Sequence, residues 1–478
     1  MDHETPLIIC NVRLPHLQES LASVIWRVIC QNGRVLQVST ELSKETSKFG
    51  TWQEIDAKGG LLLPSLCHPH VHLDKCFILE QCGSLITGDF NEAMGLTAKT
   101  KKGFALNKDD LYARGERLVR ESMGCGVTAI RAHVEVDSIV GLTCLEAGLT
   151  LKETFREQCD IQIAVFLQER LFADPNDHTP GPNLEYILQA LAMDGVGAIG
   201  SAPYVEATPT QAKMNMEAIY NLAIRHGLSL DFHLDYNLDP EAEPLIHHLV
   251  TLMRLSDHSQ HRPHVTVGHA TRLQLFTPTE WSKLAASIRD LPLTLVGLPQ
   301  SDVYMQGRVT KDTPLGAPRG TLRVPDLARD HGLQLAMGIN NIENPFTPQG
   351  SVDPLSSCSF GAAIFQTATV QDLRTLITSV TLTARQALGG YLPIPSSLVP
   401  ASGDPADFVI LHPTHPFTSS VTLQSAALNP SSYYERTTIR AGRVVALRRA
   451  HHWVLGDNTS YALTPNVVSK GDSHQHSL

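Results

Sequence analysis

The chain has 478 residues and a formal net charge of −10, with 42% hydrophobic and 18% charged residues. This composition is typical of a water-soluble globular enzyme, and the length allows one large α/β domain with a smaller satellite. The acidic balance, without an extended Lys/Arg cluster, argues against a nucleic-acid partner. No apolar run approaches the roughly 20 residues of a membrane-spanning helix, which argues against a membrane partner.

The N-terminus does not resemble an export signal. Residues 1–5 are acidic where a secretory signal would be basic, and no long apolar stretch follows them, so we expect a cytoplasmic protein. Nine cysteines are scattered without C-x-x-C spacing. This pattern fits reduced, mostly buried thiols better than a disulfide framework.

Two segments at opposite ends of the chain have the pattern of short strands separated by turns. They are residues 1–60 and 400–450, with candidate strands at 7–12, 33–38, 406–411 and 438–446. Because they bracket a long α/β region, we predict that both ends of the chain build one small composite β-sandwich. Residues 451–478 turn polar, and we predict a tail there.

The middle of the chain, residues 61–399, alternates apolar strands with amphipathic stretches. Candidate strands are 61–72, 129–137, 161–169, 197–203, 229–235, 265–271, 294–299 and 335–341, and helical periods include 214–226 and 322–331. Eight strands that alternate with helices predict an α/β fold with a parallel (β/α)8 TIM barrel. A G-x-G-x-x-G match at 195–200 opens no helix, so we reject a dinucleotide site there.

The first predicted barrel strand ends in His70-Val71-His72. Side chains two apart on a strand point to the same face, so both imidazoles can aim at one point. Two converging neutral nitrogens are half of a metal site. The alternative for an isolated H-x-H is one hydrogen-bonded core histidine and one exposed histidine. For Lys75, which follows shortly, we expect a salt bridge to a neighbouring carboxylate.

Ligand-type and proton-transfer groups stand at the ends of five predicted strands. They are His70 and His72, Gln168 and Glu169, His233 and Asp235, His269, and Asn340 and Asn341. Active sites of TIM barrels lie at the carboxyl ends of the strands, whereas packing alone would favour apolar residues there. We therefore predict that these residues share one site.

Several segments, taken in order, resemble one known family. They are residues 67–74, 131–136, 163–169, 232–235, 265–269, 305–308 and 338–341. Together they resemble the amidohydrolase superfamily, and within it the cytosine deaminase-like branch. The resemblance covers most of the barrel and also implies a terminal β-sandwich.

The resemblance implies one divalent metal ion, Zn or Fe, held by His70, His72 and His233. It implies that a strand-8 residue is a further ligand and base, and here that position is Asn340. His269 would polarise the bond under attack, and Gln168 would hydrogen-bond the substrate. We also place Glu169, Asn341 and Arg308 on the substrate side, with a structural ion pair as the alternative for Arg308.

Two positions depart from the family pattern. The strand-8 aspartate is replaced by Asn340, which can touch a metal through its amide oxygen but cannot act as a base. The glutamate that shuttles the proton is replaced by Tyr236, whose ordinary pKa near 10 makes it a poor base at pH 7. The candidate replacement acids, each with a surface ion pair as its alternative, are Asp235, Glu343, Glu169 and Glu206.

Three functions follow from these residues. The first is metal-dependent hydrolysis of a C–N bond in a small heterocyclic substrate, with Asp235, Tyr236, His269 and Asn340 as the altered catalytic set. The second is non-hydrolytic chemistry in the same pocket, by a cyclase, isomerase or lyase. The third is a non-catalytic ligand-binding relative. In each case we expect a small-molecule partner and allow for a homo-oligomer.

Overall fold

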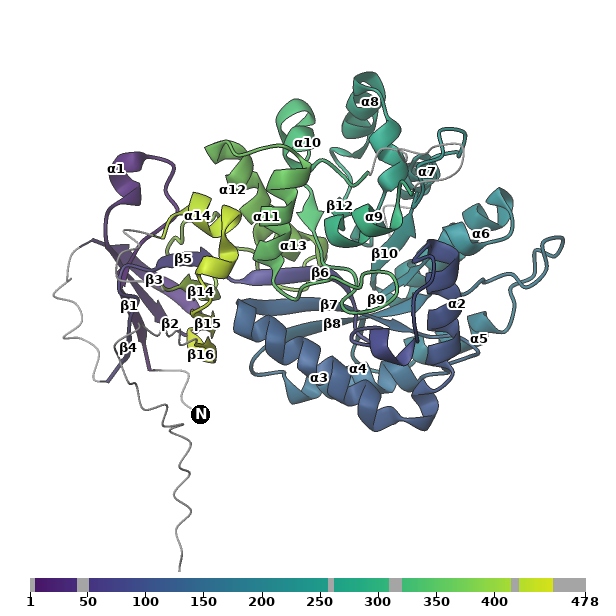
Figure 1. Cartoon of the computed structure of the whole chain (residues 1–478), viewed down its shortest axis with the longest axis horizontal. Helices are drawn as coiled ribbons and strands as arrows, with labels where there is room; N and C mark the ends of the chain where they lie inside the picture. The colour runs from purple at the N-terminus through teal and green to yellow at the C-terminus, as the bar shows by residue number, and fades with distance from the viewer. Residues whose placement is uncertain (1–4, 41–50, 257–261, 309–319, 414–420, 450–478) are drawn as a thin grey trace, which may run out of the picture.

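The computed structural model describes residues 5–40, 51–256, 262–308, 320–413 and 421–449. An eight-stranded parallel barrel lies beside two four-stranded sheets that come from the ends of the chain (Figure 1). The predicted tail, 451–478, lies outside the described residues. Within the described ranges, no helix combines the length and apolar character needed to span a lipid bilayer.

The barrel strands follow one another in chain order around the sheet. They are β6 (Leu66–His72), β7 (Val127–Glu135), β8 (Asp160–Leu167), β9 (Val196–Ser201), β10 (Ser229–Leu234), β11 (Val265–His269), β12 (Leu293–Gly297) and β13 (Ala336–Met337). Backbone hydrogen bonds then join the first and last segments, since the His72 N–H donates to the Asn340 carbonyl (2.9 Å) and the Asn340 N–H to the His70 carbonyl (3.1 Å). The predicted (β/α)8 barrel is confirmed.

Helices cover the outside of the barrel (Figure 1). The main ones are α2 (Phe90–Lys101), α3 (Lys108–Cys125), α4 (Thr143–Thr154), α5 (Asn183–Leu191), α6 (Pro209–His226), α7 (Ile246–Leu255), α8 (Pro278–Ile288), α9 (Pro299–Met305), α10 (Val324–His331), α11 (Pro354–Ile364), α12 (Val370–Ser379) and α13 (Leu382–Ala387). Helix α6 shows how the sequence sets such bounds. Thr208 caps its start by accepting the Gln211 N–H, Pro209 occupies the first turn, and Gly227 ends it at φ 64°.

The predicted strand 61–72 is in fact two strands. Residues Leu61–Pro64 form β5, which pairs with β14 (Phe408–Leu411) outside the barrel, and only β6 belongs to the barrel. All residues from 61 to 72 are buried, so the apolar run continues across the change of sheet. An unbroken apolar run predicts a buried strand but cannot show which sheet the strand joins.

The terminal segments form two sheets with one shared core. One sheet contains β1 (Leu7–Val12), β2 (Trp26–Gln31), β3 (Arg34–Ser39) and β4 (Gln53–Asp56), and the other contains β5, β14, β15 (Arg436–Arg440) and β16 (Arg443–Arg448). Leu7 and Ile9 of the first sheet pack in the same cluster as Leu62 and Phe408 of the second. The predicted composite β-sandwich is therefore present. The nine cysteines are free, and all except Cys10 are buried, as the sequence predicts.

Gly200 on β9 marks a place where two barrel strands leave no room for a side chain. A Cβ atom at this position would lie 1.9 Å from the Asp231 carbonyl oxygen on β10. We expect Gly200→Ala to lower the free energy of unfolding by about 2–4 kcal/mol, because the backbone must move, as in overpacked cores. The shift of the urea midpoint measures this loss.

Gly124→Ala on α3 is the matched control for Gly200→Ala. Nothing lies within 4 Å of a Cβ built at Gly124. The exchange should stabilise the protein by about 0.5–1 kcal/mol, since alanine is the better helix former. Equal midpoints for the two variants would contradict the close approach at Gly200.

Candidate active site

Three imidazoles from two strands converge on one point inside the barrel. His70 and His72 come from the end of β6, and His233 comes from β10. The Nε2 atom of His233 lies 2.9 Å from Nε2 of His70 and 3.1 Å from Nε2 of His72. Burial lowers the pKa of His70 to about 4 and holds the pKa values of the other two well below 6.5. Three neutral nitrogens aimed at one point form a ligand set for a divalent metal ion.

A buried carboxylate lies behind these imidazoles. Asp231 Oδ1 is 3.4 Å from His70 Nδ1 and 3.4 Å from His133 Nε2, while Oδ2 accepts from Arg131 at 2.9 Å. Burial acts to raise the pKa of Asp231, but His133 and His70 outweigh it and hold the pKa well below 3.8. A carboxylate in this place can orient His70 and raise the basicity of its ring, as carboxylates do behind histidines that bind metals.

His133 and Asp231 received no role in the sequence analysis. Ligand atoms of His70, His133, Asp231 and His233 all lie within 4.8 Å of one another. The sequence did contain a signal for Asp231. Asp231 and His233 are two residues apart, as His70 and His72 are, so both side chains face the same side of their strand. Because these residues offer both nitrogen and oxygen donors, they fit a divalent ion.

Asn340 presents a free oxygen at the same place. Its Nδ2 donates to Ser301 Oγ (2.8 Å), whereas its buried Oδ1 has no hydrogen-bond partner among the described residues. Asn340 lines the same small pocket as His72 and His233. Its φ of 59° is left-handed, a conformation that asparagine tolerates better than most residues. Burying a carbonyl oxygen without a hydrogen-bond partner costs free energy, unless a ligand or an ion supplies the missing contact.

His269, at the end of β11, is held in one tautomer. Its Nδ1 donates to Asp302 Oδ1 (2.8 Å), and Asp302 Oδ2 accepts from the Thr321 hydroxyl (2.7 Å) and the Leu298 N–H (3.1 Å). The proton on Nδ1 leaves the lone pair on Nε2 available. Burial lowers the pKa of His269 below 6.5, although Asp302 acts in the opposite direction. Asp302 was also missed from the sequence, although it lies in the segment that follows the carboxyl end of β12, where active-site residues of TIM barrels are found.

The pocket bounded by these residues is small and has an aromatic cover. It contains only about 20 Å³ of free space and is lined by His72, Lys75, Phe90, Gln168, Tyr204, His233, Tyr236, His269, Ser301, Asn340, Asn341 and Phe346. We call Phe90, Tyr204, Tyr236 and Phe346 the aromatic cap. The centroid of the Phe90 ring lies 5.9–6.1 Å from those of the other three, and the Tyr236 and His269 rings lie 3.8 Å apart with their planes tilted by 32°. No carboxylate belongs to this lining in the part of the chain that is described.

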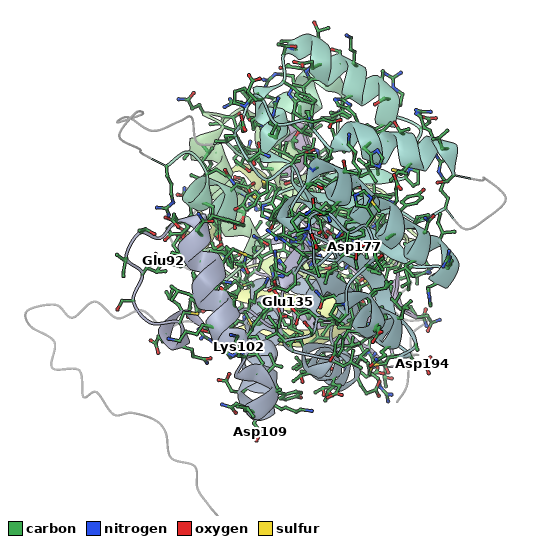
Figure 2. All side chains as sticks on the ribbon, turned by 90° about the vertical axis from the view of Figure 1, so that its right-hand side faces the viewer. Glu92, Lys102, Asp109, Glu135, Asp177 and Asp194 are labelled. Carbon is green, nitrogen blue, oxygen red and sulfur yellow. The ribbon has the colours of Figure 1, made fainter. Side chains whose placement is uncertain are left out.

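A buried ion network ties helix α2 to the floor of the pocket. Lys75 Nζ lies 2.7 Å from Glu135 Oε1, which confirms the expected salt bridge, and Lys101 of α2 reaches Glu135 (3.0 Å), Asp137 (2.9 Å) and Glu169 (2.6 Å). Burial opposes ionisation of Glu135, but the two lysines lower its pKa to about 2. Figure 2 shows α2 between the labelled Glu92 and Lys102, with Glu135 near the middle of the view.

Two proposed site residues serve the backbone instead of the pocket. Asp235 accepts the N–H groups of Leu245 (2.7 Å) and Ile246 (3.1 Å), and burial raises its pKa to about 6. Arg308 donates to the carbonyls of Thr87 and Gly88 in the loop before α2. Neither residue lines the small pocket.

The other candidate acids also point elsewhere. Glu343 lies at the surface, 3.4 Å from Arg117. Glu206 accepts the N–H of Leu171 (2.8 Å), and Glu169 pairs with Lys101. The structure therefore brings together the histidines, Gln168, Tyr236, Asn340 and Asn341, and leaves the candidate replacement carboxylates outside the pocket.

Comparison with known proteins gives the same architecture and a set of relatives. No family model matches the chain. The N-isopropylammelide isopropyl amidohydrolase of Pseudomonas sp. (strain ADP) is 24% identical over 367 residues, which cover 76% of this chain and 82% of the relative. The pterin deaminase of Rhizobium rhizogenes (strain K84 / ATCC BAA-868) is 23% identical over 63% of this chain and 64% of the relative.

The names of these two relatives, an amidohydrolase and a deaminase, indicate a likeness to the amidohydrolase superfamily. The crystal structure of 5-methylcytosine deaminase from Klebsiella pneumoniae, liganded with 5-fluorocytosine, superposes with a TM-score of 0.75 and 24% identity, covering 94% of this chain and 99% of that chain. At this identity the structural match shows the fold. The barrel shared with that structure thus carries a histidine cluster at the carboxyl ends of its strands in this chain, with neutral residues at positions 236 and 340.

Proposed function

We propose that the protein is a metal-dependent hydrolase that cleaves a C–N bond in a small heterocyclic substrate, by deamination or by opening of a cyclic amide or amidine. The observation that carries this proposal is the convergence of the three Nε2 atoms of His70, His72 and His233. Sequence relatives that are named as an amidohydrolase and a deaminase support it.

His70, His72 and His233 would hold one Zn or Fe ion, with the Asn340 Oδ1 atom as a neutral oxygen donor. When bound, such an ion lowers the pKa of water and polarises the bond under attack. In the described ranges, no carboxylate lines the pocket. Proton transfer must therefore be carried out by the other side chains around it.

The His269–Asp302 pair is suited to move a proton. His269 Nε2 can accept a proton from the attacking water and return it to the leaving nitrogen, while the hydrogen bond from Nδ1 to Asp302 stabilises the imidazolium formed in between. Burial, and next the charge of Asp302, keep the pKa of Tyr236 well above 10, so its hydroxyl remains a donor at neutral pH. Tyr236 can therefore donate a hydrogen bond but cannot replace the shuttle glutamate as a base.

Amide side chains would orient the ring of the substrate. Gln168 Oε1 faces Lys75 Nζ at 3.4 Å, and Asn341 Oδ1 accepts from Asn344 at 2.7 Å. These contacts fix which end of each amide is free to meet the substrate. Together with the aromatic cap, these two amide side chains favour a substrate with a flat ring that carries hydrogen-bonding groups.

The neutral residues at 236 and 340 favour a second candidate, non-hydrolytic chemistry by a cyclase, isomerase or lyase. In that case His269 would move a proton within the substrate and no water would be added. A ligand-binding role without turnover is the third alternative.

The test combines ammonia release with metal binding. Full-length protein, loaded with Zn²⁺ or Fe²⁺, is assayed for ammonia release from aminated pyrimidines, triazines and pterins. We expect about one metal ion per chain and, for one ring class, either ammonia release or a ring-opened product. Metal binding with ring turnover but without ammonia or a ring-opened product would favour the second candidate, and no metal binding would contradict both.

Asn340→Asp separates the role of the amide from the rest of the site. A carboxylate here adds an anionic ligand, and we expect metal to bind about tenfold tighter or more, by analogy with changes around metal ligands. Asn341→Asp is the matched control, because it adds the same charge one residue away. Equal gains in both variants, measured by competition with a chelator, would contradict a ligand position at 340.

A further inference from the structure

A cavity of about 300 Å³ lies between the β-sandwich and the helices that cover the barrel. Its wall includes residues 13–17 and 22–23, Val370 and Arg374 of α12, and the start of α14 (Leu423–Leu428). Helices α12 and α14 lie on the side of the barrel that faces the sandwich (Figure 1). This space, which we call the junction cavity, shares no lining residue with the small pocket of the candidate active site.

Two guanidinium groups line the junction cavity without a carboxylate partner. Arg374 donates from Nη1 to the Pro15 carbonyl at 2.7 Å, and Arg13 donates from Nη1 to the Ala22 carbonyl at 3.4 Å. Neither arginine forms an ion pair within the described ranges, and no acidic residue belongs to the lining given there. Burial lowers the pKa of Arg374, and no neighbouring carboxylate acts in the opposite direction. Both cations therefore lack a counter-charge from this part of the protein.

The other polar atoms of this wall do not replace the missing anion. Nε2 of His16 and Nε of Arg13 are buried without a hydrogen-bond partner among the residues that the structure describes. Burial, and next the charge of Arg374, lower the pKa of His16 below 6.5, so its imidazole is neutral at pH 7. The described lining thus carries two positive charges and no negative charge, on a chain whose formal net charge is −10. An anionic ligand would supply the counter-charge.

Apolar side chains make up much of the remaining wall. Leu14, Leu61 and Val421 are buried beneath the cavity, and Leu17 and Val370 are 57% and 46% exposed beside it. An inorganic anion would leave this apolar surface in contact with water. A ligand with an apolar body would cover it and gain free energy from each buried methylene group.

We propose that the junction cavity binds a small organic monocarboxylate. Its carboxylate would pair with the guanidinium groups of Arg13 and Arg374, and its apolar body would lie against the leucine and valine side chains. Guanidinium groups offer several N–H donors in the geometry that a carboxylate accepts. The volume lies at the lower end of the range for sites of small ligands. The site uses no residue of the histidine cluster, so this inference does not depend on the proposed function.

Three probe ligands test the proposal on the full-length protein. Hexanoate, hexanamide and acetate are titrated and their binding is followed by ligand-observed NMR. We expect hexanoate to bind about tenfold tighter than hexanamide, because only the acid carries a charge that pairs with arginine. We also expect hexanoate to bind about tenfold tighter than acetate, because it buries four more methylene groups. Equal binding of hexanoate and hexanamide, or no binding of hexanoate, would overturn the site.

Arg374→Gln then locates the preference for the acid. Arg34→Gln is the matched control, because Arg34 is an exposed arginine of β3 that also donates to a backbone carbonyl, that of Gly403 at 2.8 Å, and does not line the cavity. We expect the preference for hexanoate over hexanamide to disappear in Arg374→Gln and to persist in Arg34→Gln. A preference that survives Arg374→Gln would overturn the assignment. That result is also the one expected if hexanoate binds a metal ion at the histidine cluster.

Arg13→Gln provides a second variant on the other side of the cavity. Arg374 joins α12 to the backbone at Pro15, so thermal unfolding first establishes that each variant is folded. Arg13→Gln decides the question if Arg374→Gln does not fold. We expect Arg13→Gln to reduce the preference for hexanoate at least threefold, and an unchanged preference would overturn a site that uses both arginines.

Discussion

His233→Ala is expected to remove metal binding and to abolish turnover. The Nε2 atom of His233 lies 2.9 Å from that of His70 and 3.1 Å from that of His72. Its loss leaves two histidines from β6 and the neutral oxygen of Asn340, which is too weak a set for a stable mononuclear site. We expect the metal content to fall from about one to below about 0.1 per chain and activity to fall by about 10³-fold or more.

Elemental analysis after dialysis at a fixed free metal concentration measures this loss. His248→Ala is the matched control, because it removes an imidazole that lies 3.2 Å from Glu217 on the outside of the barrel. Because His233 is buried, its alanine variant is expected to unfold at a lower temperature than the control, so metal content is compared at a temperature at which both variants are folded. Full metal occupancy in His233→Ala would show that the convergence of imidazoles is not a metal site.

The parts of the fold that follow from periodicity could be predicted from the sequence. Strand β8 is buried on both faces along nearly its whole length, and its apolar run at 163–167 stands out between helical periods. Strand β13 could not be predicted at its length, because only Ala336–Met337 pair as a strand and the chain then turns through the left-handed Asn340. The division between β5 and β6 was equally hidden, since both strands are fully buried.

The geometry of strands also decided which residues of the candidate site could be predicted. His70, His72, His233 and His269 were found because a strand end in a barrel fixes where a side chain points. Asp235 also ends a strand, but φ of 53° turns its carboxylate toward the N–H groups that begin α7. This outcome depends on loop geometry that the sequence pattern does not encode. The carboxylates that support the histidines, Asp231 and Asp302, were missed because their role appears only when strands far apart in the chain are brought together.

Asp302→Asn is expected to lower kcat by about 10²–10⁴-fold while KM changes little, as for other carboxylates that orient a catalytic histidine. Asp302 is a positioning residue, since it acts through His269. In the variant, the amide oxygen would stay with the Leu298 N–H, and the amide nitrogen would face His269 Nδ1. This arrangement requires an unprotonated Nδ1, so the proton moves to Nε2 and the lone pair that faces the pocket is lost.

The pH profile distinguishes this role from a loss of stability. Asp302 favours the protonated form of His269, so its removal lowers the pKa of His269, and the acid limb of kcat/KM should move to lower pH. Asp290→Asn is the matched control, because it neutralises an exposed carboxylate that pairs with Arg254 at 2.8 Å, and it should leave both kcat and the limb unchanged. A variant that loses activity through KM alone, with the limb in place, would show that Asp302 supports the pocket wall and does not set the tautomer of His269.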